Sequence, residues 1–383
     1  MAVKTASSPN KQLLNKISAG SNIPALDTVR GIAASMVVIG HTLGPRQLGS
    51  TAVSIFFVLS GFLITWLLVR ESDLTGQISL RDFYIRRTLR IFPAFYVFWI
   101  VCVTAAVLRG VQIPWREVWS SFFYVGDYYD ALRHGTGGIM GITWSLGVEE
   151  KFYLLWPFIF ACLHRNPAKL LKVGCFFIVG IWLYRVVLCL TFSLPTDYLR
   201  YAFESRFDNI LYGSVLALAF RMVKLDPVLR AVKRVPLMPI GLAASLLGLT
   251  FLEERAGATY CYVFGMALDA TIIAVALIQL VYLAALQNWT WLDHPALRFL
   301  GRISYSLYLY HIVVAATVDH YLPNLRLRWA YPLIYAASVL VAYASYRLVE
   351  KPFLRLKDRF AAGSHRRKQA RGEGTTAVAA KLN

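Results

Sequence analysis

The sequence predicts an all-α protein, a polytopic integral membrane bundle of about ten transmembrane helices. Of its 383 residues, 57% are hydrophobic and only 16% are charged, whereas soluble domains are about half apolar and about a quarter charged. Apolar runs of about 20 residues, the length that an α-helix needs to span a bilayer, recur along the chain. Lys and Arg gather between these runs, which is typical of the loops of membrane proteins.

The apolar runs define one membrane domain, expected over residues 23–355. Two polar segments flank it, residues 1–22 and the basic tail 356–383, and both are expected to be disordered because neither has a periodic apolar pattern. The predicted spans lie near residues 25–44, 51–70, 91–109, 143–163, 170–192, 207–223, 236–252, 262–286, 301–318 and 331–349.

The distribution of basic residues predicts that both termini are cytoplasmic. Segments on the predicted cytoplasmic side hold 28 Lys and Arg, and segments on the opposite side hold 9, an excess that marks the cytoplasmic side. Because the basic residues follow the membrane topology, the net charge of +19 does not indicate nucleic-acid binding. The five cysteines lack the spacing of a zinc site or a disulfide framework, and we expect them to pack among apolar helices.

Ionisable side chains within the predicted spans are the first functional candidates, because they are costly in lipid. The first span holds Asp27, Arg30 and His41. Arg30 and His41 are close to three helical turns apart, so they share one face and are separated by ~16 Å along the helix. Asp27 lies one turn from Arg30 and can pair with it. This aligned polar face favours a functional role for His41 over a structural hydrogen bond.

The fourth span carries a second polar stripe. Ser145, Glu149 and Tyr153 are spaced by four residues and share a face, whereas Glu150 shares its face with leucines. We therefore favour Glu149 over Glu150. Because the first and fourth spans run in opposite directions, Glu149 is expected at the depth of His41, where a carboxylate would stabilise the imidazolium of a general base. Two unrelated helix contacts are the alternative.

Basic residues before the third span indicate a site for a polyanion. Arg86 and Arg90 are four residues apart, with Arg87 between them, and Pro93 is expected to open the helix. If this segment is helical, Arg86 and Arg90 point together and form a two-guanidinium fork suited to phosphates. A cytoplasmic polyanion such as coenzyme A fits this placement, and so do lipid head groups.

The ninth span places His311 midway through an apolar and aromatic helix. Ser304 shares its face, and Tyr308 lies about one turn before it. A positioning role in the site and a structural hydrogen bond are both open for His311.

Six segments together resemble acyltransferase family 3, the membrane O-acyltransferases that modify bacterial surface polysaccharides, O-antigens and Nod factors. The segments occur in the family's order and cover roughly residues 23–355. They are LDTVRGIAASMVVIGH, FFVLSGFLI, RRTLRIFP, TWSLGVEEKFYLLWP, ISYSLYLYH and RLVEKPF.

The resemblance implies an acyltransferase of the bacterial inner membrane. It would take an acyl group, with acetyl the expected one, from acyl-CoA and would hold no permanent cofactor or metal. The acceptor would be a hydroxyl of a glycan or lipid-linked saccharide. The family's essential Arg and His fall on Arg30 and His41, its Arg-x-x-x-Arg patch on Arg86 and Arg90, and its Trp-Ser-Leu-x-x-Glu element ends at Glu149. We predict His41, Glu149 and Arg30 as catalytic, and Arg86, Arg87 and Arg90 as acyl-CoA-binding. Supporting positions are Asp27, Ser60, Gly61, Trp144, Ser145, Glu150, Tyr153, Tyr310 and His311. Thr28 and Lys151 depart from common family residues.

Selection of the acceptor is less determined. Some relatives carry a fused extracytoplasmic domain, and the chain is expected to end too soon for one. Selection is then expected in the bundle, in the loop 110–142 or in a separate extracytoplasmic partner. The aromatic residues of that loop suit either sugar binding or an interfacial belt; they are Trp115, Trp119, Tyr124, Tyr128 and Tyr129. A transporter or flippase that uses the same intramembrane polar residues is the alternative function, and a non-enzymatic scaffold is less favoured.

Overall fold

The computed structural model describes residues 24–43, 46–133, 138–191, 196–222, 238–285 and 294–359. These residues form α-helices with short 3-10 and π-helical turns, and they contain no strand, so the all-α prediction is confirmed for the described part of the chain. The predicted disorder of residues 1–22 lies outside the described residues. Residues 356–359 of the predicted disordered tail are helical instead, because they continue the last helix and help to line a cavity.

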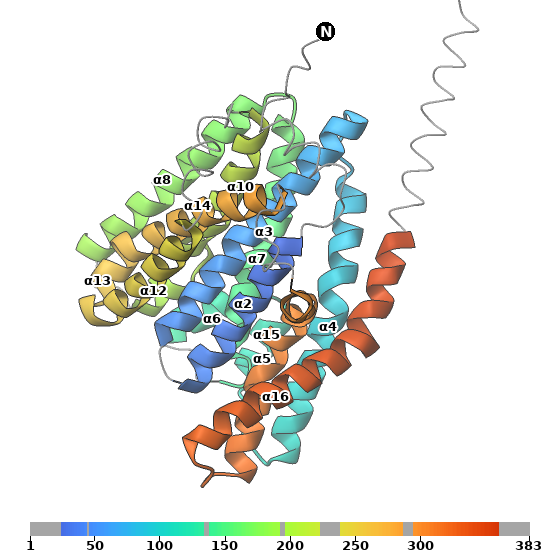
Figure 1. Cartoon of the computed structure of the whole chain (residues 1–383), viewed down its shortest axis with the longest axis vertical. Helices are drawn as coiled ribbons and strands as arrows, with labels where there is room; N and C mark the ends of the chain where they lie inside the picture. The colour runs from blue at the N-terminus through green and yellow to red at the C-terminus, as the bar shows by residue number, and fades with distance from the viewer. Residues whose placement is uncertain are drawn as a thin grey trace, which may run out of the picture.

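The colour in Figure 1 follows the described helices along the chain. In chain order they are α2 (Pro24–Leu43), α3 (Arg46–Thr75), α4 (Leu80–Leu108), α5 (Trp115–Phe122), α6 (Gly126–Arg133), η1 (Gly141–Thr143), α7 (Trp144–Leu163), α8 (Pro167–Thr191), α9 (Thr196–Tyr201), α10 (Phe203–Met222), α12 (Met238–Ala256), α13 (Ala258–Tyr260), η2 (Cys261–Gly265), α14 (Met266–Ala285), α15 (Pro295–Tyr321), α16 (Leu327–Ser345) and η4 (Tyr346–Glu350).

Six described helical segments are long and apolar enough to cross a membrane. They are Gln47–Thr75, Leu80–Leu108, Pro167–Thr191, Ala258–Val281, Pro295–Tyr321 and Leu327–Arg359. The other four predicted spans also fall on long helices, α2, α7, α10 and α12. Polar residues dilute the apolar character of these helices; α7, for example, carries Glu149, Glu150 and Lys151 in succession. A multi-pass membrane protein is thus confirmed, while the ten crossings and their orientation stay predictions.

The start of α4 differs from the prediction. The helix begins at Leu80, where Ser79 caps it by accepting a hydrogen bond from the backbone N–H of Asp82. Pro93 therefore lies inside α4 and does not open it. The prediction failed because the polar segment that contains the arginines was read as a loop boundary, although its cap and spacing allow a helix.

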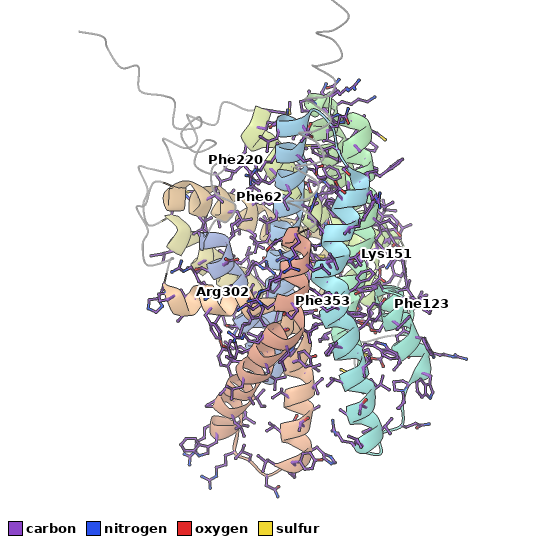
Figure 2. All side chains as sticks on the ribbon, turned by 90° about the vertical axis from the view of Figure 1, so that its right-hand side faces the viewer. Phe62, Phe123, Lys151, Phe220, Arg302 and Phe353 are labelled. Atoms are coloured by element: carbon purple, nitrogen blue, oxygen red, sulfur yellow. The ribbon has the colours of Figure 1, made fainter. Side chains whose placement is uncertain are left out.

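Helix α3 lies at the centre of the bundle (Figure 1). Helices α8, α12, α13 and α14 lie to one side of it, and α4, α15 and α16 to the other. Where α3 meets α10, a Cβ at Gly61 would overlap the carbonyl oxygen of Ile210, and a Cβ at Gly213 would overlap that of Val58. Phe62 and Phe220 extend this contact with ring centroids 6.1 Å apart (Figure 2). Glycines thus allow the two backbones to touch, as small residues do in membrane helices.

The predicted loop 110–142 contains the short helices α5 and α6, and much of its aromatic content serves packing. Tyr124 lies against Phe95 with ring centroids 4.4 Å apart, and Tyr128 donates a hydrogen bond to Glu204 of α10 at 2.8 Å. Trp115 and Trp119 are exposed. Lys151 of α7 ties this region down through an ion pair with the buried Asp127 of α6, at 2.6 Å.

Helix α6 also buries a carboxyl group whose pKa is raised. Asp130 is 3% exposed, and burial, together with the nearby carboxylates of Glu117 and Asp127, raises the pKa of Asp130 to about 8. An unfolded chain would release this proton near its ordinary pKa of about 3.9. The folded state therefore binds more protons than the unfolded state between these two pH values.

We expect Asp130→Ala to be too disruptive for a clean test and Asp130→Asn to report the effect. The protonated form of Asp130 stabilises the folded state fully below about pH 4. This contribution is lost as the pH rises through about 8, because the ionised carboxylate is more stable in the unfolded chain. Thermal unfolding of the purified wild type should decline over that range, and the Asn variant should decline less. Parallel curves for the two proteins would contradict this assignment.

The contact between α3 and α10 predicts that Gly61→Ala destabilises the bundle. The added methyl group forces the two backbones apart, and overpacking of this kind typically costs about 1–3 kcal/mol. Gly180→Ala in α8 is the matched control, because a Cβ there meets nothing within 4 Å. Thermal unfolding in detergent should show a lower midpoint for Gly61→Ala alone; equal midpoints would show that the helices separate freely.

Candidate active site

A cavity of about 600 Å³ lies among α2, α3, α4, α7 and α15 and reaches the helical turns after α16. Apolar side chains such as Leu63 and Trp66 form part of its wall. The charged residues of the wall are predominantly basic: Arg30, Arg70, Arg87, Arg90, Arg302, Lys351, Arg355 and Lys357, against Asp27, Glu149, Glu350 and Asp358. A cavity with this balance of charge and apolar surface suits a ligand that combines anionic groups with an apolar or uncharged part.

Three of these arginines act on one another across the wall of the cavity. Arg30 comes from α2, and Arg87 and Arg90 come from the second and third turns of α4. Arg90 interacts electrostatically with both other arginines and with the carboxylate of Glu350. The guanidinium carbon of Arg87 lies 3.5 Å from the centroid of the Tyr153 ring, a cation–π contact. Like charges held this close together in a cavity are stabilised by an anion between them.

Glu149 lies in the wall of this cavity with both carboxylate oxygens occupied. Ser60 of α3 donates to Oε1 at 2.9 Å, and Tyr153 donates to Oε2 at 2.9 Å. The guanidinium of Arg87 lies over the ring of Tyr153. Because Glu149 accepts the hydrogen bond of the Tyr153 hydroxyl, it fixes the ring on which Arg87 packs. Glu150 does not line the cavity. The structure thus brings together Ser60, Glu149 and Tyr153, all of which were predicted to belong to the site.

Arg86 is placed differently from the prediction. Its Nη2 forms an ion pair with Oε2 of Glu71 at 3.1 Å, and it does not line the cavity. The predicted fork of Arg86 and Arg90 stays a prediction, and a ligand that used it would compete with Glu71 for Arg86. Spacing along one helix correctly placed the two residues on neighbouring turns, but it could not show that Glu71 at the end of α3 would pair with one of them.

His41 lies at the end of α2 beside His311 of α15, with ring centroids 5.0 Å apart. Nδ1 of His41 is 2.9 Å from the carbonyl oxygen of Val37, and Nδ1 of His311 is 2.7 Å from that of Tyr308. Because a carbonyl oxygen only accepts, each Nδ1 carries the proton and each neutral ring keeps its lone pair on Nε2. The His41 residue is exposed, whereas His311 is fully buried and its Nε2 has no partner among the described residues.

The predicted support of His41 by Glu149 has no counterpart in the geometry of the described residues. The oxygens of Glu149 are taken by Ser60 and Tyr153, and the titratable ring next to His41 belongs to His311. Sequence reasoning matched the depths of two helices but could not tell which helix packs against α2. The pairing of α2 with α15 could have been predicted only from the glycines at their contact, Gly31 and Gly301.

Tyr308 connects the cavity to the histidines, and sequence reasoning gave it no role of its own. It lines the inner end of the cavity, and its ring centroid is 6.1 Å from that of His311. Its hydroxyl lies 2.6 Å from Oγ of Ser145 and donates to the carbonyl of Ile142 at 2.7 Å. Ser145 also lines the cavity. The hydrogen-bonded pair of Tyr308 and Ser145 therefore forms the part of the cavity wall that lies towards the histidine pair.

Two other predicted supporting residues serve mainly in packing. The ring of Trp144 lies edge-on to Phe57 at 6.1 Å and to Tyr201 at 5.0 Å. Tyr310 lies edge-on to Phe98 at 5.5 Å and is 4% exposed. Both are core contacts around the site. Neither lines the cavity.

Comparison of the amino-acid sequence with known proteins identifies its family. The family model described as an acyltransferase domain, Acyl_transf_3, matches residues 23–347. The chain therefore belongs to acyltransferase family 3, and the resemblance inferred from its six segments is confirmed.

Curated relatives point in the same direction. A peptidoglycan O-acetyltransferase of Listeria monocytogenes is 30% identical over an alignment that covers 86% of this chain and 55% of that protein. A Staphylococcus aureus protein with the provisional name of O-acetyltransferase is 31% identical, with 86% and 57% covered. The chain spans little more than half the length of these curated relatives. No solved structure matches it.

Proposed function

We propose that this protein is an O-acyltransferase of the bacterial inner membrane, which moves an acyl group, with acetyl the expected one, from cytoplasmic acyl-CoA to a hydroxyl of an envelope glycan or lipid-linked saccharide. The observation that carries the proposal is the cavity that joins three arginines, Arg30, Arg87 and Arg90, to a wall one helical turn from His311. Family membership and the names of the relatives support the reaction class. A glycan of the peptidoglycan type is the favoured acceptor, since one relative is named for it.

The arginine end suits the phosphates of coenzyme A. Guanidinium groups form charge-assisted, bidentate hydrogen bonds with phosphate oxygens, and such an anion would offset the repulsion among Arg30, Arg87 and Arg90. The apolar part of the wall then receives the uncharged pantetheine arm, which leads the thioester towards Tyr308. In this arrangement Glu149 acts on the donor side, because it holds Tyr153 under Arg87.

The pair of His41 and His311 beyond the cavity wall suits proton transfer. Nε2 of His41 would accept the proton of the acceptor hydroxyl as its oxygen attacks the thioester carbonyl, so that a C–O bond forms. When the C–S bond breaks, the thiolate of coenzyme A takes up the proton and leaves. His311 packs against the ring of His41 from the buried side, and the support of the imidazolium by Glu149 stays a prediction.

A transporter or flippase would also require a polar cavity inside the bundle. Histidines inside the membrane also serve as proton relays in transporters, so family membership and the names of the relatives favour the enzyme. Measured acyl transfer by the purified protein separates the two functions.

The donor site predicts unequal effects of neighbouring arginines. Arg90→Gln and Arg87→Gln should each weaken acetyl-CoA binding by about tenfold or more, because each removes charge-assisted hydrogen bonds worth about 1.5–3 kcal/mol. Arg86→Gln is the matched control and should have little effect, because Arg86 pairs with Glu71 outside the cavity. Titration calorimetry of detergent-solubilised protein measures the affinities. A loss for Arg86→Gln as large as that for Arg90→Gln would argue against this cavity as the donor site.

The role of His41 predicts a loss of turnover without a loss of donor binding. His41→Ala should reduce transfer by about 10²–10⁴-fold, the usual contribution of general-base catalysis, and His41→Gln should not restore it, since an amide does not accept the proton. Thermal stability and acetyl-CoA affinity should stay at wild-type values. A variant that loses all three properties would identify His41 as a packing residue.

A further inference from the structure

The cavity of about 600 Å³, called the donor cavity from here on, has more basic residues in its wall than the proposed function uses. Arg30, Arg87 and Arg90 form the proposed donor site. The further basic residues of the wall are Arg70, Arg302, Lys351, Arg355 and Lys357. In the predicted topology these residues all lie at the cytoplasmic ends of spans, on the side from which a cytoplasmic donor would enter.

Exposure to solvent orders the residues of this wall. Arg302 and Arg355 are exposed, whereas the three arginines of the proposed donor site are half-buried. Tyr308 is only 7% exposed. Because a lining residue that is open to solvent lies at the opening of a cavity, Arg302 and Arg355 belong to the opening and Tyr308 belongs to the inner end.

The helical turns that follow η4 present one face to the donor cavity. Four residues of this face line the cavity, and they are Lys351, Leu354, Arg355 and Asp358. Their spacing of three or four residues places them on one side of a helix. These turns continue from η4, which packs against α4 (Figure 1), and Lys357 is close enough to Arg90 of α4 for the two charges to interact. The C-terminal turns thus add positive charge to the cavity that holds the donor site.

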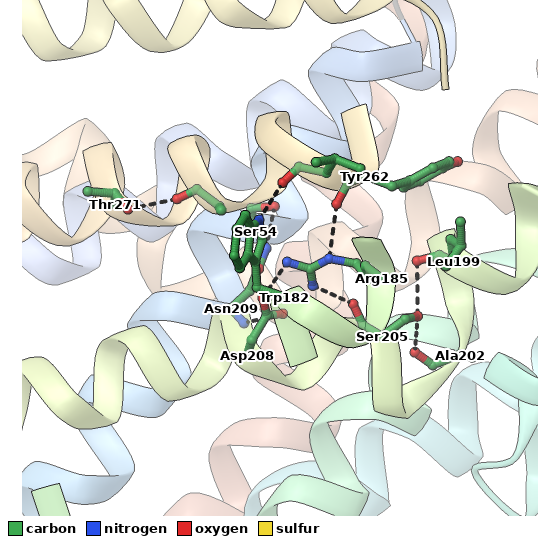
Figure 3. Close-up of polar contacts among 12 residues, drawn as sticks. Ser54, Trp182, Arg185, Leu199, Ala202, Ser205, Asp208, Asn209, Tyr262 and Thr271 are labelled. Carbon is green, nitrogen blue, oxygen red and sulfur yellow. Dashed lines mark hydrogen bonds and ion pairs between the residues drawn. The ribbon is translucent and has the colours of Figure 1, made fainter. Parts of the chain in front are cut away.

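The two arginines at the opening are not used by the fold. No described residue forms an ion pair or a hydrogen bond with the guanidinium of Arg302 or Arg355. Arg185 shows the opposite case, since it donates to the carbonyl of Tyr262 at 3.0 Å and forms an ion pair with the buried Asp208 at 2.7 Å (Figure 3). Unpaired arginines are common on protein surfaces, but Arg302 and Arg355 come from two separate helical segments and line the same cavity. Their donor groups are therefore available to one ligand.

The chemistry of acyl-CoA requires two separate anion sites. The molecule carries a diphosphate next to the pantetheine arm and a phosphate monoester on the 3′ oxygen of the ribose, at the end away from the thioester. The monoester has a charge of about −1.5 to −2 at neutral pH and three acceptor oxygens. With the thioester towards Tyr308 and the diphosphate on the three arginines of the donor site, the ribose would lie towards the opening. The order of groups along the ligand then matches the order of exposure along the wall.

We infer that Arg302 and Arg355 bind the 3′-phosphate of acyl-CoA at the opening of the donor cavity. The inference rests on the proposed function and specifies which part of its donor the outer wall recognises. Guanidinium groups form charge-assisted hydrogen bonds with phosphate oxygens, and Lys351 and Lys357 add to the local positive charge. The enzyme would thus distinguish acyl-CoA from a thioester donor that lacks this phosphate.

The test compares the binding of acetyl-CoA and 3′-dephospho-acetyl-CoA to the full-length protein, by titration calorimetry in a neutral detergent without anionic lipid. The wild type should bind acetyl-CoA about tenfold or more tightly than the dephospho form. The double variant Arg302→Gln with Arg355→Gln should bind acetyl-CoA about tenfold more weakly and should keep the wild-type affinity for the dephospho form, which also shows that it folds. The difference between the two ligands should shrink at high ionic strength, because salt screens exposed charges.

Two further variants serve as controls. Arg90→Gln should weaken the binding of both ligands by the same factor, because Arg90 belongs to the proposed site of the diphosphate. Arg347→Gln is the matched surface control. The guanidinium of Arg347 lies 5.8 Å from the ring centroid of Tyr343, and Arg347 is exposed but does not line the donor cavity. This variant should bind both ligands as the wild type does.

The outcomes separate this inference from the proposed function. A wild type that binds both ligands with equal affinity overturns the inference, since the two arginines then serve topology or lipid head groups, while the proposed donor stands. A double variant that loses affinity for both ligands by the same factor also overturns it, because the arginines then act on a part that both ligands share. An equal loss for Arg347→Gln would show a general effect of charge and would overturn it as well. A wild type that binds neither ligand overturns the proposed function and this inference with it.

Discussion

The direct contact between glycine backbones determines where the functional side chains lie. A Cβ at Gly31 of α2 would come within 2.9 Å of the backbone nitrogen of Gly301 in α15, and a Cβ at Gly40 would come within 2.7 Å of that of Gly49 in α3. These two contacts hold α2 against both neighbours. As a result His41, one residue after Gly40, meets His311 on one side and the start of α3 on the other. Without the glycines, each interhelical distance would grow and the imidazole pair would separate.

The charged residues show how such a bundle keeps ionised groups within an apolar environment. Arg185 is fully buried, and Asp208 and two backbone carbonyls satisfy its guanidinium. The arginines of the donor cavity are different, since Arg90 interacts with the guanidinium groups of Arg30 and Arg87 as well as with the carboxylate of Glu350. The first arrangement stabilises the fold by pairing, while the second keeps positive charge available. A structural arginine and a binding arginine can thus be told apart by what surrounds them.

Much of the helical architecture could be predicted from the sequence, because apolar runs of sufficient length have few alternatives to a membrane helix. Residues on a single helix were also placed well, as the stripe of Glu149 and Tyr153 illustrates. Predictions that required knowing which helices touch were less successful. The contact of His41 with His311 and the ion pair of Arg86 with Glu71 were not foreseen. Periodicity defines the face of a helix, but the depth and identity of its neighbour depend on packing across the whole bundle.

The position of the histidine pair beside Tyr308 has an electrical consequence. The ring of Tyr308, which lines the donor cavity, is 6.1 Å from that of His311, and the ring of His311 is 5.0 Å from that of His41. In the proposed reaction the proton would therefore be released and taken up at nearly the same depth in the membrane. Moving one elementary charge across the full voltage involves about 2.3 kcal/mol per 100 mV, and this proton would cross only a small part of it. The proton transfer itself would thus depend little on the energised state of the cell.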